Sequence, residues 1–194
     1  MRIELCGGIA SGKTTFTHAL NTQLARFAAV YEDFSSNTFL DDFYKDIARY
    51  AYETEISFLL QHMHQIKTAQ SRGVDLVCDF SIEQDYAYAV SNLETVSKRS
   101  FEEVHKEAIR QIGFPDLIIF LQCPSHVLVD RIHARGRANE MEINTAYLDD
   151  TVQVLRNRLT QQNSDVIVID SNQYDFRKPN DMKRIIASIL QMYL

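Results

Sequence analysis

The sequence predicts an α/β fold in which a parallel β-sheet is covered by helices on both faces. The first observation is a set of five short apolar runs that alternate with stretches of helical apolar spacing. The second is the pattern Gly-x-x-x-x-Gly-Lys-Thr at residues 7–14, which lies between the first apolar run and the first helical stretch. The predicted strands are residues 2–6, 28–31, 74–79, 117–121 and 166–170.

The stretches between these strands predict the helices. The longest, residues 46–71, carries an apolar stripe along one face and is stopped by Gly73. A second long stretch begins near Tyr86 and is broken by Gly113 and Pro115. Residues 37–40 have no periodicity and are expected to be irregular. The predicted helices are residues 14–27, 46–71, 86–112, 125–137, 148–161 and 182–193.

Length and composition favour one globular domain over residues 1–194. Hydrophobic residues make up 45% of the chain and charged residues 24%, which is ordinary for a globular protein. The net charge of −6 argues against nucleic acid as the main partner, because phosphate contacts need a basic face. We find no internal repeat, low-complexity segment or linker.

Cysteine usage and hydropathy indicate the compartment. Two of the three cysteines, Cys6 and Cys78, lie inside apolar runs, which favours reduced thiols, and the cysteine spacing matches no zinc site. The first strand begins almost at residue 1, and no apolar run approaches membrane-spanning length. We therefore expect a cytoplasmic protein without a membrane partner.

The glycine-rich pattern predicts a phosphate-binding loop that joins a strand to a helix. Glycines let backbone N–H groups turn inward around phosphate oxygens, and the helix N-terminus adds partial positive charge. Lys13 supplies a mobile charge for the outer phosphates, and Thr14 a hydroxyl ligand for Mg²⁺. The alternative is a turn that only links two elements. The residues expected to bind ATP here are Gly7, Gly8, Ile9, Ala10, Ser11, Gly12, Lys13, Thr14 and Thr15.

Two predicted strands lead to a carboxylate. Glu32 follows the strand at residues 28–31, and Asp79 is the last residue of the strand at 74–79. Ligands of open α/β sheets lie at the carboxyl ends of the strands, so both acids should face the glycine-rich loop. Asp79 is placed to hold Mg²⁺ directly or through water, and Glu32 to accept a proton from an attacking hydroxyl. The alternative is that each acid only caps a following turn.

Three arginines cluster in this otherwise acidic chain. Arg131 and Arg135 share a helix face, and Gly136 breaks the helix before Arg137. An arginine-rich helix followed by a glycine hinge suits a lid, about residues 131–143, that closes over a triphosphate and neutralises transferring charge. A solvated basic face is the alternative.

Three polar residues on the middle helices are further candidates. Glu55 and His62 lie on a face of the long helix next to its apolar stripe, with Phe58 between them. A lone histidine on a helix is more often exposed or simply buried with a partner than functional. Asp85 precedes the next helical stretch and is either its N-cap or a ligand-binding residue.

With these residues assembled, nearly the whole chain resembles the deoxynucleoside kinase family. The resemblance implies a three-layer sandwich around a five-stranded parallel sheet of order 2-3-1-4-5, and a homodimer. It implies that Glu32 is the base for the sugar 5′-hydroxyl, and that Tyr44 and Glu140 bind the 3′-hydroxyl. It further implies that Glu55, His62 and Asp85 bind the nucleobase, and that Asp175 and Phe176 belong to the loop around the ATP adenine.

Two residues depart from the family pattern. Phe80 stands where the Asp-Arg-Ser motif has its arginine, and this change removes a charge and every hydrogen-bond donor. Glu55 stands where the family usually has a glutamine. An ionised Glu55 only accepts hydrogen bonds and so matches the adjacent N–H donors of guanine, which favours a purine such as that of deoxyguanosine.

The resemblance thus implies ATP-dependent phosphorylation of a deoxynucleoside at its 5′-hydroxyl, a nucleotide-salvage reaction. In this hypothesis ATP and Mg²⁺ are bound by the loop, Thr14 and Asp79, and the catalytic residues are Lys13, Glu32, Arg131, Arg135 and Arg137. One alternative is a nucleoside monophosphate kinase of the thymidylate type, which Phe80 and Glu55 disfavour. The other is a nucleotide-binding protein that has lost transferase activity.

Overall fold

The computed structural model of the protein describes residues 1–161 and 163–193. Its centre is a five-stranded, all-parallel sheet of order β2-β3-β1-β4-β5, which confirms the predicted topology. Each strand is short and mostly apolar, as expected when helices cover both faces. The strands are β1 (Arg2–Cys6), β2 (Phe27–Val30), β3 (Asp75–Cys78), β4 (Leu117–Gln122) and β5 (Asp165–Asp170).

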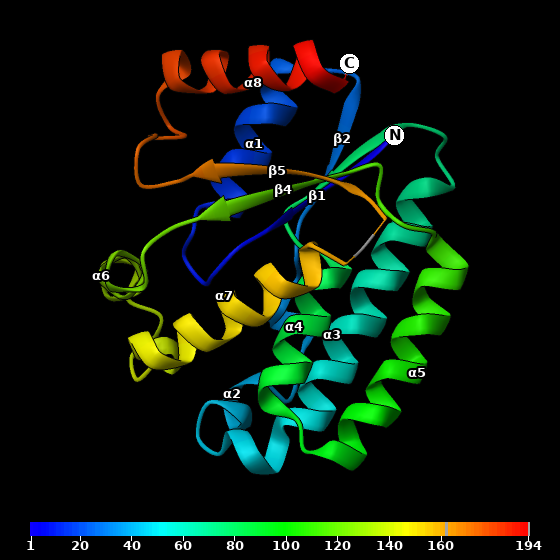
Figure 1. Ribbon diagram of the computed structural model, residues 1–194, viewed down its shortest axis with the longest axis vertical. Helices are drawn as coiled ribbons and strands as arrows, with labels where there is room; N and C mark the ends of the chain where they lie inside the picture. Colours follow the sequence, from blue (N-terminus) through cyan, green and yellow to red (C-terminus); the bar gives the residue numbers. More distant parts are fainter. Residues whose placement is uncertain (162, 194) are drawn as a thin grey trace.

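Helices form a layer on each face of the sheet (Figure 1). One layer contains α1 (Lys13–Gln23) and α8 (Pro179–Tyr193), and the other contains α3 (Ile47–Gln70), α4 (Ile82–Asn92), α5 (Thr95–Ile112) and α7 (Thr145–Leu159). The helix α6 (Ser125–Arg135) lies beside the end of the sheet. The shorter elements are η1 (Phe34–Ser36), α2 (Leu40–Phe43) and η2 (Ala138–Glu140).

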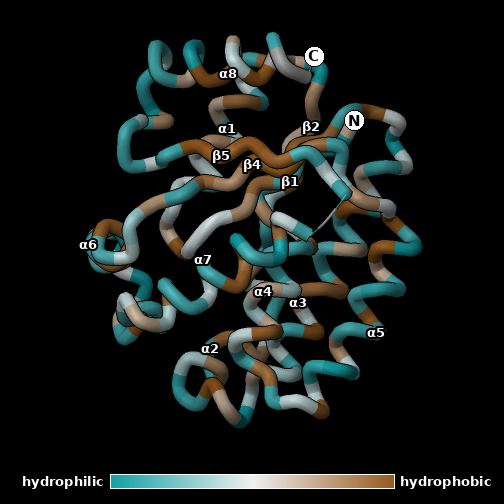
Figure 2. The backbone as a smooth tube through the Cα atoms, in the orientation of Figure 1, coloured by the Kyte–Doolittle hydropathy of each residue, from teal (hydrophilic) through white to brown (hydrophobic). Residues whose placement is uncertain are grey.

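Alternating side chains of the strands feed two separate cores. On β1, Ile3 and Leu5 are fully buried against the α1 and α8 layer, whereas Cys6 packs on the α4 and α7 side. On α1, Phe16 and Leu20 are four residues apart and both fully buried. Figure 2 shows the resulting apolar band along β4 and β5 in the middle of the molecule.

Several predicted boundaries differ from the structure, and two of the differences have identifiable reasons. The sequence pattern closes the first helix at Phe27, but α1 ends at Gln23 and Phe27 begins β2, where it is buried in the core. The helix predicted over residues 86–112 is two helices, with Leu93 and Glu94 extended between them. Because Leu93 is buried in the same core as both helices, its packing overrides the local helical pattern.

The loops that follow β1, β2 and β3 meet at the carboxyl edge of the sheet. They carry residues 7–12, Glu32 and Asp79, respectively. Among the described residues, no helix is long and apolar enough to cross a membrane. The sheet therefore brings the predicted phosphate loop and both predicted acids to one place.

Candidate active site

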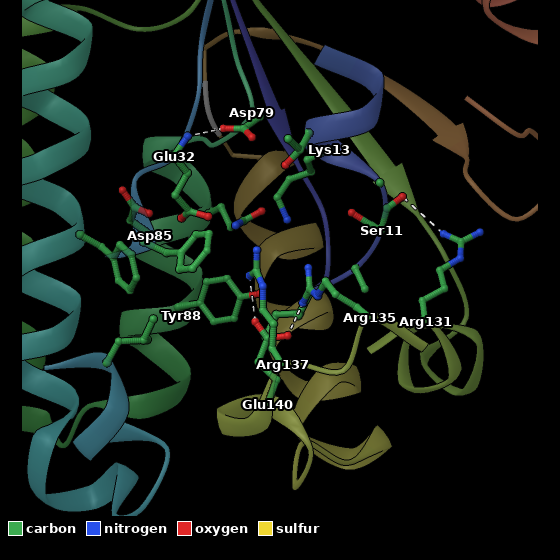
Figure 3. A pocket seen from close by; sticks show the side chains of 18 of the residues that line it. Ser11, Lys13, Glu32, Asp79, Asp85, Tyr88, Arg131, Arg135, Arg137 and Glu140 are labelled. Carbon is green, nitrogen blue, oxygen red and sulfur yellow. Dashed lines mark hydrogen bonds and ion pairs between the residues drawn. The ribbon is translucent and has the colours of Figure 1, made fainter. Parts of the chain in front are cut away.

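A cavity of about 650 Å³ opens at the carboxyl edge of the sheet. Its walls come from the glycine-rich loop, the segment after β2, α3, α4 and the region after α6 (Figure 3). Clefts at this edge are the usual ligand sites of open α/β sheets. Most of the predicted site residues line it, from Ile9 to Thr15 and at Glu32, Tyr44, Glu55, Asp79, Asp85, Arg131, Arg135, Arg137 and Glu140.

The glycine-rich loop has the backbone that the sequence predicts. Gly7 has a φ of 148°, and a Cβ there would lie 2.6 Å from the Leu121 carbonyl oxygen. Gly12 has a φ of 101° and immediately precedes α1, so the N-terminus of that helix opens into the cavity. The loop is fastened to α4, because the Gly7 amide donates to Gln84 Oε1 at 2.9 Å.

Lys13 begins α1 and lies across the loop. Its Nζ donates to the carbonyl oxygens of Gly7 at 3.0 Å and Gly8 at 3.3 Å. Burial lowers the pKa of Lys13, and the nearby carboxylates of Glu32 and Asp79 oppose that shift. The ammonium group is thus held where the outer phosphates of a nucleotide on this loop would lie.

Glu32 and Asp79 follow the neighbouring strands β2 and β3, and both line the cavity next to the glycine-rich loop. The Glu32 amide donates to Asp79 Oδ1 at 2.6 Å. Burial raises the pKa of Asp79, while interactions with the Thr14 side chain and the Glu32 amide act in the opposite direction. Thr14 and Asp79 therefore adjoin each other, although their metal-binding role stays a prediction.

The three arginines separate into two groups. Arg131 Nη2 donates to the Ser171 carbonyl at 2.8 Å, and Figure 3 shows this side chain beside Ser11, away from Glu32. Arg135 and Arg137 instead both form ion pairs with Glu140. The Cζ atom of Arg137 also lies 3.9 Å from the centroid of the Phe34 ring. Gly136, with φ 71° and ψ 30°, ends α6 and turns the chain between Arg135 and Arg137, as predicted.

Glu55 is buried, with 4% of its surface exposed, and accepts a hydrogen bond from Asn92 Nδ2 at 2.8 Å. Burial is the main cause that raises the pKa of Glu55 to about 8, and the charge of Asp85 adds to it. The carboxyl is therefore mainly neutral at pH 7. This corrects the expectation of an ionised Glu55, which was the physical basis for favouring guanine.

His62 does not line the cavity, contrary to the expectation that it binds the nucleobase. It is 1% exposed and lies behind the cavity wall. Its Nδ1 is 2.8 Å from Asp85 Oδ2, its Nε2 is 3.4 Å from Glu32 Oε1, and its ring stacks on Phe80. Both ring nitrogens thus face protein carboxylates.

Asp85 is not a helix cap. The N-cap of α4 is Ser81, whose side chain accepts from the Glu83 amide at 3.2 Å. Asp85 lies one turn into the helix, 5% exposed, between His62 and the cavity. Of the two interpretations of this residue, the structure favours the one that places it in the site.

The two residues predicted to surround the ATP adenine lie beside the cavity rather than on its wall. Phe176 is 6% exposed, packs edge-on against Phe16, and its ring would be 3.1 Å from a Cβ on Gly12. Asp175 is paired with Arg177, and Arg177 does line the cavity. Contact of Asp175 and Phe176 with adenine stays a prediction.

Sequence reasoning missed Tyr88, Asn92 and Gln84. Tyr88 lines the cavity, Asn92 binds Glu55, and Gln84 binds the glycine-rich loop. Tyr88 and Asn92 follow Asp85 at i+3 and i+7, so they share its helix face. That spacing is a usable signal. Nothing in the local pattern singles out Gln84, whose role depends on how α4 meets β1.

Fold and site together are typical of one class, the nucleotide-binding α/β phosphotransferases: a glycine-rich loop, two acids at strand ends and three arginines on and after α6 lie around one cavity. A family model described as "Deoxynucleoside kinase" matches residues 3–193. The chain belongs to the deoxynucleoside kinase family, and its enzymatic class is that of a deoxynucleoside kinase, a phosphotransferase.

Curated relatives agree with this family. A deoxyguanosine kinase of Bacillus subtilis (strain 168) is 25% identical over 200 residues, covering 98% of this chain and 96% of the relative. A deoxyadenosine kinase of Dictyostelium discoideum is 28% identical over 193 residues, covering 96% and 78%, respectively.

Solved structures show the same fold. A deoxyadenosine kinase from M. mycoides with bound dCTP superposes with a TM-score of 0.82 over 99% of this chain and 100% of that chain, at 18% identity. The same enzyme with bound dATP gives a TM-score of 0.77 over 97% of this chain and 98% of that chain, at 20% identity. At these identities the similarity supports the fold alone.

Proposed function

We propose that the protein transfers the γ-phosphoryl group of ATP to the 5′-hydroxyl of a purine deoxynucleoside. The observation that carries this proposal is that Lys13, on the phosphate loop, and Glu32, a candidate base, line the same cavity. A donor phosphate on the loop and an acceptor hydroxyl at Glu32 would then be close enough for in-line transfer.

The donor half of the site consists of the loop amides, Lys13 and the lid. In this proposal Arg135 and Arg137 leave part of their contact with Glu140 and approach the transferring phosphate when the lid, about residues 131–143, closes. Glu140 would then bind the sugar 3′-hydroxyl together with Tyr44. The proximity of these groups supports this arrangement, because both arginines, Tyr44 and Glu140 line the cavity.

Thr14 and Asp79 fit a magnesium ion that is bound together with the nucleotide. Mg²⁺ keeps several waters and phosphate oxygens, so one hydroxyl and one carboxylate suffice from the protein. Bound there, the ion would neutralise phosphate charge.

The purine preference rests on the substrates named for the relatives, and the state of Glu55 is compatible with it. The relatives above are deoxyguanosine and deoxyadenosine kinases. A neutral Glu55 offers one donor and one acceptor, as the amide of a glutamine does. Adenine and guanine each present a neighbouring donor and acceptor, as the pyrimidines also do, so Glu55 can pair with either purine and the choice of purines comes from the relatives.

The test is ADP formation by the purified protein with ATP, Mg²⁺ and each of the four deoxynucleosides. We expect ADP and a 5′-monophosphate with deoxyadenosine or deoxyguanosine, at higher kcat/KM than with the pyrimidines. The matched control is 2′,5′-dideoxyadenosine, which lacks the acceptor hydroxyl and should give no ADP above the nucleoside-free rate. A strict pyrimidine preference would overturn the base assignment, and nucleoside-independent ADP formation would overturn the kinase assignment.

The homodimer and the cytoplasmic location remain predictions from the family resemblance and composition. Light scattering of the purified protein measures the first directly. A mass of twice 22.4 kDa would support the dimer, and a mass of 22.4 kDa would contradict it.

A further inference from the structure

The Glu32 carboxylate lies in a part of the site that is rich in negative charge. Asp79 accepts a hydrogen bond from the Glu32 amide, and Asp85 lines the same cavity (Figure 3). The charge of Glu32 raises the pKa of both Asp79 and Asp85, because nearby like charges disfavour ionisation of one another. A base in this position therefore needs a compensating cation.

His62 is the basic side chain that touches Glu32. Among residues 1–161 and 163–193 no other basic nitrogen lies within 4.0 Å of a Glu32 carboxylate oxygen. Lys13 and Arg137 act on Glu32 only from farther across the cavity. The Phe80 side chain, which follows Asp79 in sequence, carries no charge.

The geometry favours a doubly protonated imidazole. Nδ1 faces Asp85 Oδ2 on α4 at 2.8 Å, and Nε2 faces Glu32 Oε1 at 3.4 Å. A neutral imidazole would leave one nitrogen lone pair pointing at a carboxylate oxygen. Burial alone would lower the pKa of His62, but Asp85 and Glu32 outweigh it and raise that pKa to about 10.

The Phe80 ring stacks on the His62 ring. Phe80 is fully buried, and its ring lies 4.0 Å from the His62 ring with an interplanar angle of 8°. Phe58 lies on another side of His62, with centroids 5.8 Å apart. Stacking on the face of an aromatic ring suits a cation and fixes the imidazole plane. Phe80 therefore holds the charged His62 ring in place, although Phe80 itself is uncharged.

We propose that His62 is the positioning residue for Glu32: as an imidazolium clamped between Phe80 and Asp85, it holds Glu32 Oε1 and leaves the other carboxylate oxygen for the substrate hydroxyl. This role rests on the proposed function, in which Glu32 is the base. It changes the assignment of His62 from a nucleobase contact to support of the chemistry, and it gives Phe80 a role.

The first experiment needs no variant. Protein labelled with ¹⁵N-histidine is studied by NMR at pH 8, where an ordinary histidine is neutral. The groups that face His62 are Asp85, Glu32, Phe80 and Phe58, and both titratable ones are acids. We expect both His62 ring nitrogens to be protonated. A ring with one unprotonated nitrogen would overturn the inference whether or not the protein is a kinase.

The second experiment separates positioning from structure. His62→Gln removes the charge, and His62→Arg keeps a cation that can stack on Phe80. We expect His62→Gln to lower kcat by about 100-fold with the ATP KM unchanged, a loss typical of a disturbed general base. His62→Arg should recover at least about 10-fold of that loss. The matched control is His64→Gln, because His64 is an exposed histidine on the same helix, and this variant should behave as wild type.

The outcomes are distinguishable from failure of the proposed function. If the wild-type protein shows no transfer, the kinase assignment fails and the NMR result alone decides the charge of His62. If the wild type is active and His62→Gln keeps its kcat, or if His62→Arg is as slow as a folded His62→Gln, the positioning role is wrong.

Discussion

At the scale of single residues, the site depends on how burial sets charge. Glu55 and His62 are both almost completely buried on α3, yet their ionisation is opposite. For Glu55, burial and the nearby Asp85 carboxylate raise the pKa more than the hydrogen bond from Asn92 lowers it, so Glu55 holds a proton and is neutral. His62 has two carboxylates, so it holds an extra proton and is charged.

The state of Glu55 predicts a pH dependence of stability. Its pKa is about 8 in the folded protein against an ordinary value near 4.5, so its contribution to stability is present below pH 4.5 and is lost as the pH rises through 8. Glu55→Gln removes this titration. We expect the free energy of unfolding of Glu55→Gln, relative to wild type, to increase between pH 5 and 8.5 by on the order of a few kcal/mol.

Urea denaturation of both proteins at pH 5 and 8.5 measures this difference. Glu53→Gln is the matched control, because Glu53 is an exposed acid on the same helix. Curves for Glu55→Gln and wild type that stay parallel over this range would show that Glu55 is ionised in the folded protein.

These residues also show what the sequence can and cannot predict. Glu32 and Asp79 can be placed from strand ends alone, because parallel strands share one carboxyl edge. The charge of Glu55 and the partners of His62 cannot be placed in this way, because they depend on side chains from other elements: Asn92 and Asp85 of α4, and Glu32 after β2. In the sequence Phe80 is only the loss of an arginine, whereas the structure places His62 beside it.

At the scale of elements, the end of α6 at Gly136 sets the direction in which the chain carries Arg137 away from Arg135. Gly136 adopts a left-handed conformation, and the nearest atom to a Cβ there would be the His133 carbonyl oxygen at 4.0 Å. Gly136→Ala would therefore meet backbone strain but no clash. We expect it to cost about 1 kcal/mol in stability and, by shifting Arg137, to raise the ATP KM or lower kcat severalfold.

Gly73→Ala is the matched control for this prediction. Gly73 has a φ of 66° and lies just beyond the far end of α3, and a Cβ added there would meet no atom of the described residues within 4 Å. It should lose similar stability without a kinetic effect. Steady-state kinetics and urea midpoints of the two variants compare them, and identical kinetics would show that the turn at Gly136 does not position Arg137.

The elements also show where sequence patterns are misleading. The strands agree with the prediction to within one residue at each end, because each strand is a short, mostly apolar run that stands out from its surroundings in the sequence. The break between α4 and α5 is missed, because no glycine or proline marks it and burial of Leu93 decides it. Such tertiary effects leave no local signal.

At the scale of the whole molecule, two parts of the chain meet across one cavity. The glycine-rich loop and the region after α6 form one wall, and the segment after β2, α3 and α4 form the other. In the proposed function the first wall binds the nucleotide and the second binds the nucleoside. Glu32 lies where the two sides meet, next to Asp79. We therefore predict that nucleotide binding and phosphoryl transfer can be separated by one substitution.

The direct test is Glu32→Gln, assayed for turnover and for ATP affinity on the same preparation. Glutamine has nearly the shape of glutamate but cannot accept the hydroxyl proton, so kcat should fall by at least about 100-fold. The ATP Kd, measured by calorimetry, should stay within about threefold of wild type, because the loop and Lys13 are unchanged. Turnover near the wild-type rate in Glu32→Gln would contradict the assignment of Glu32 as the base.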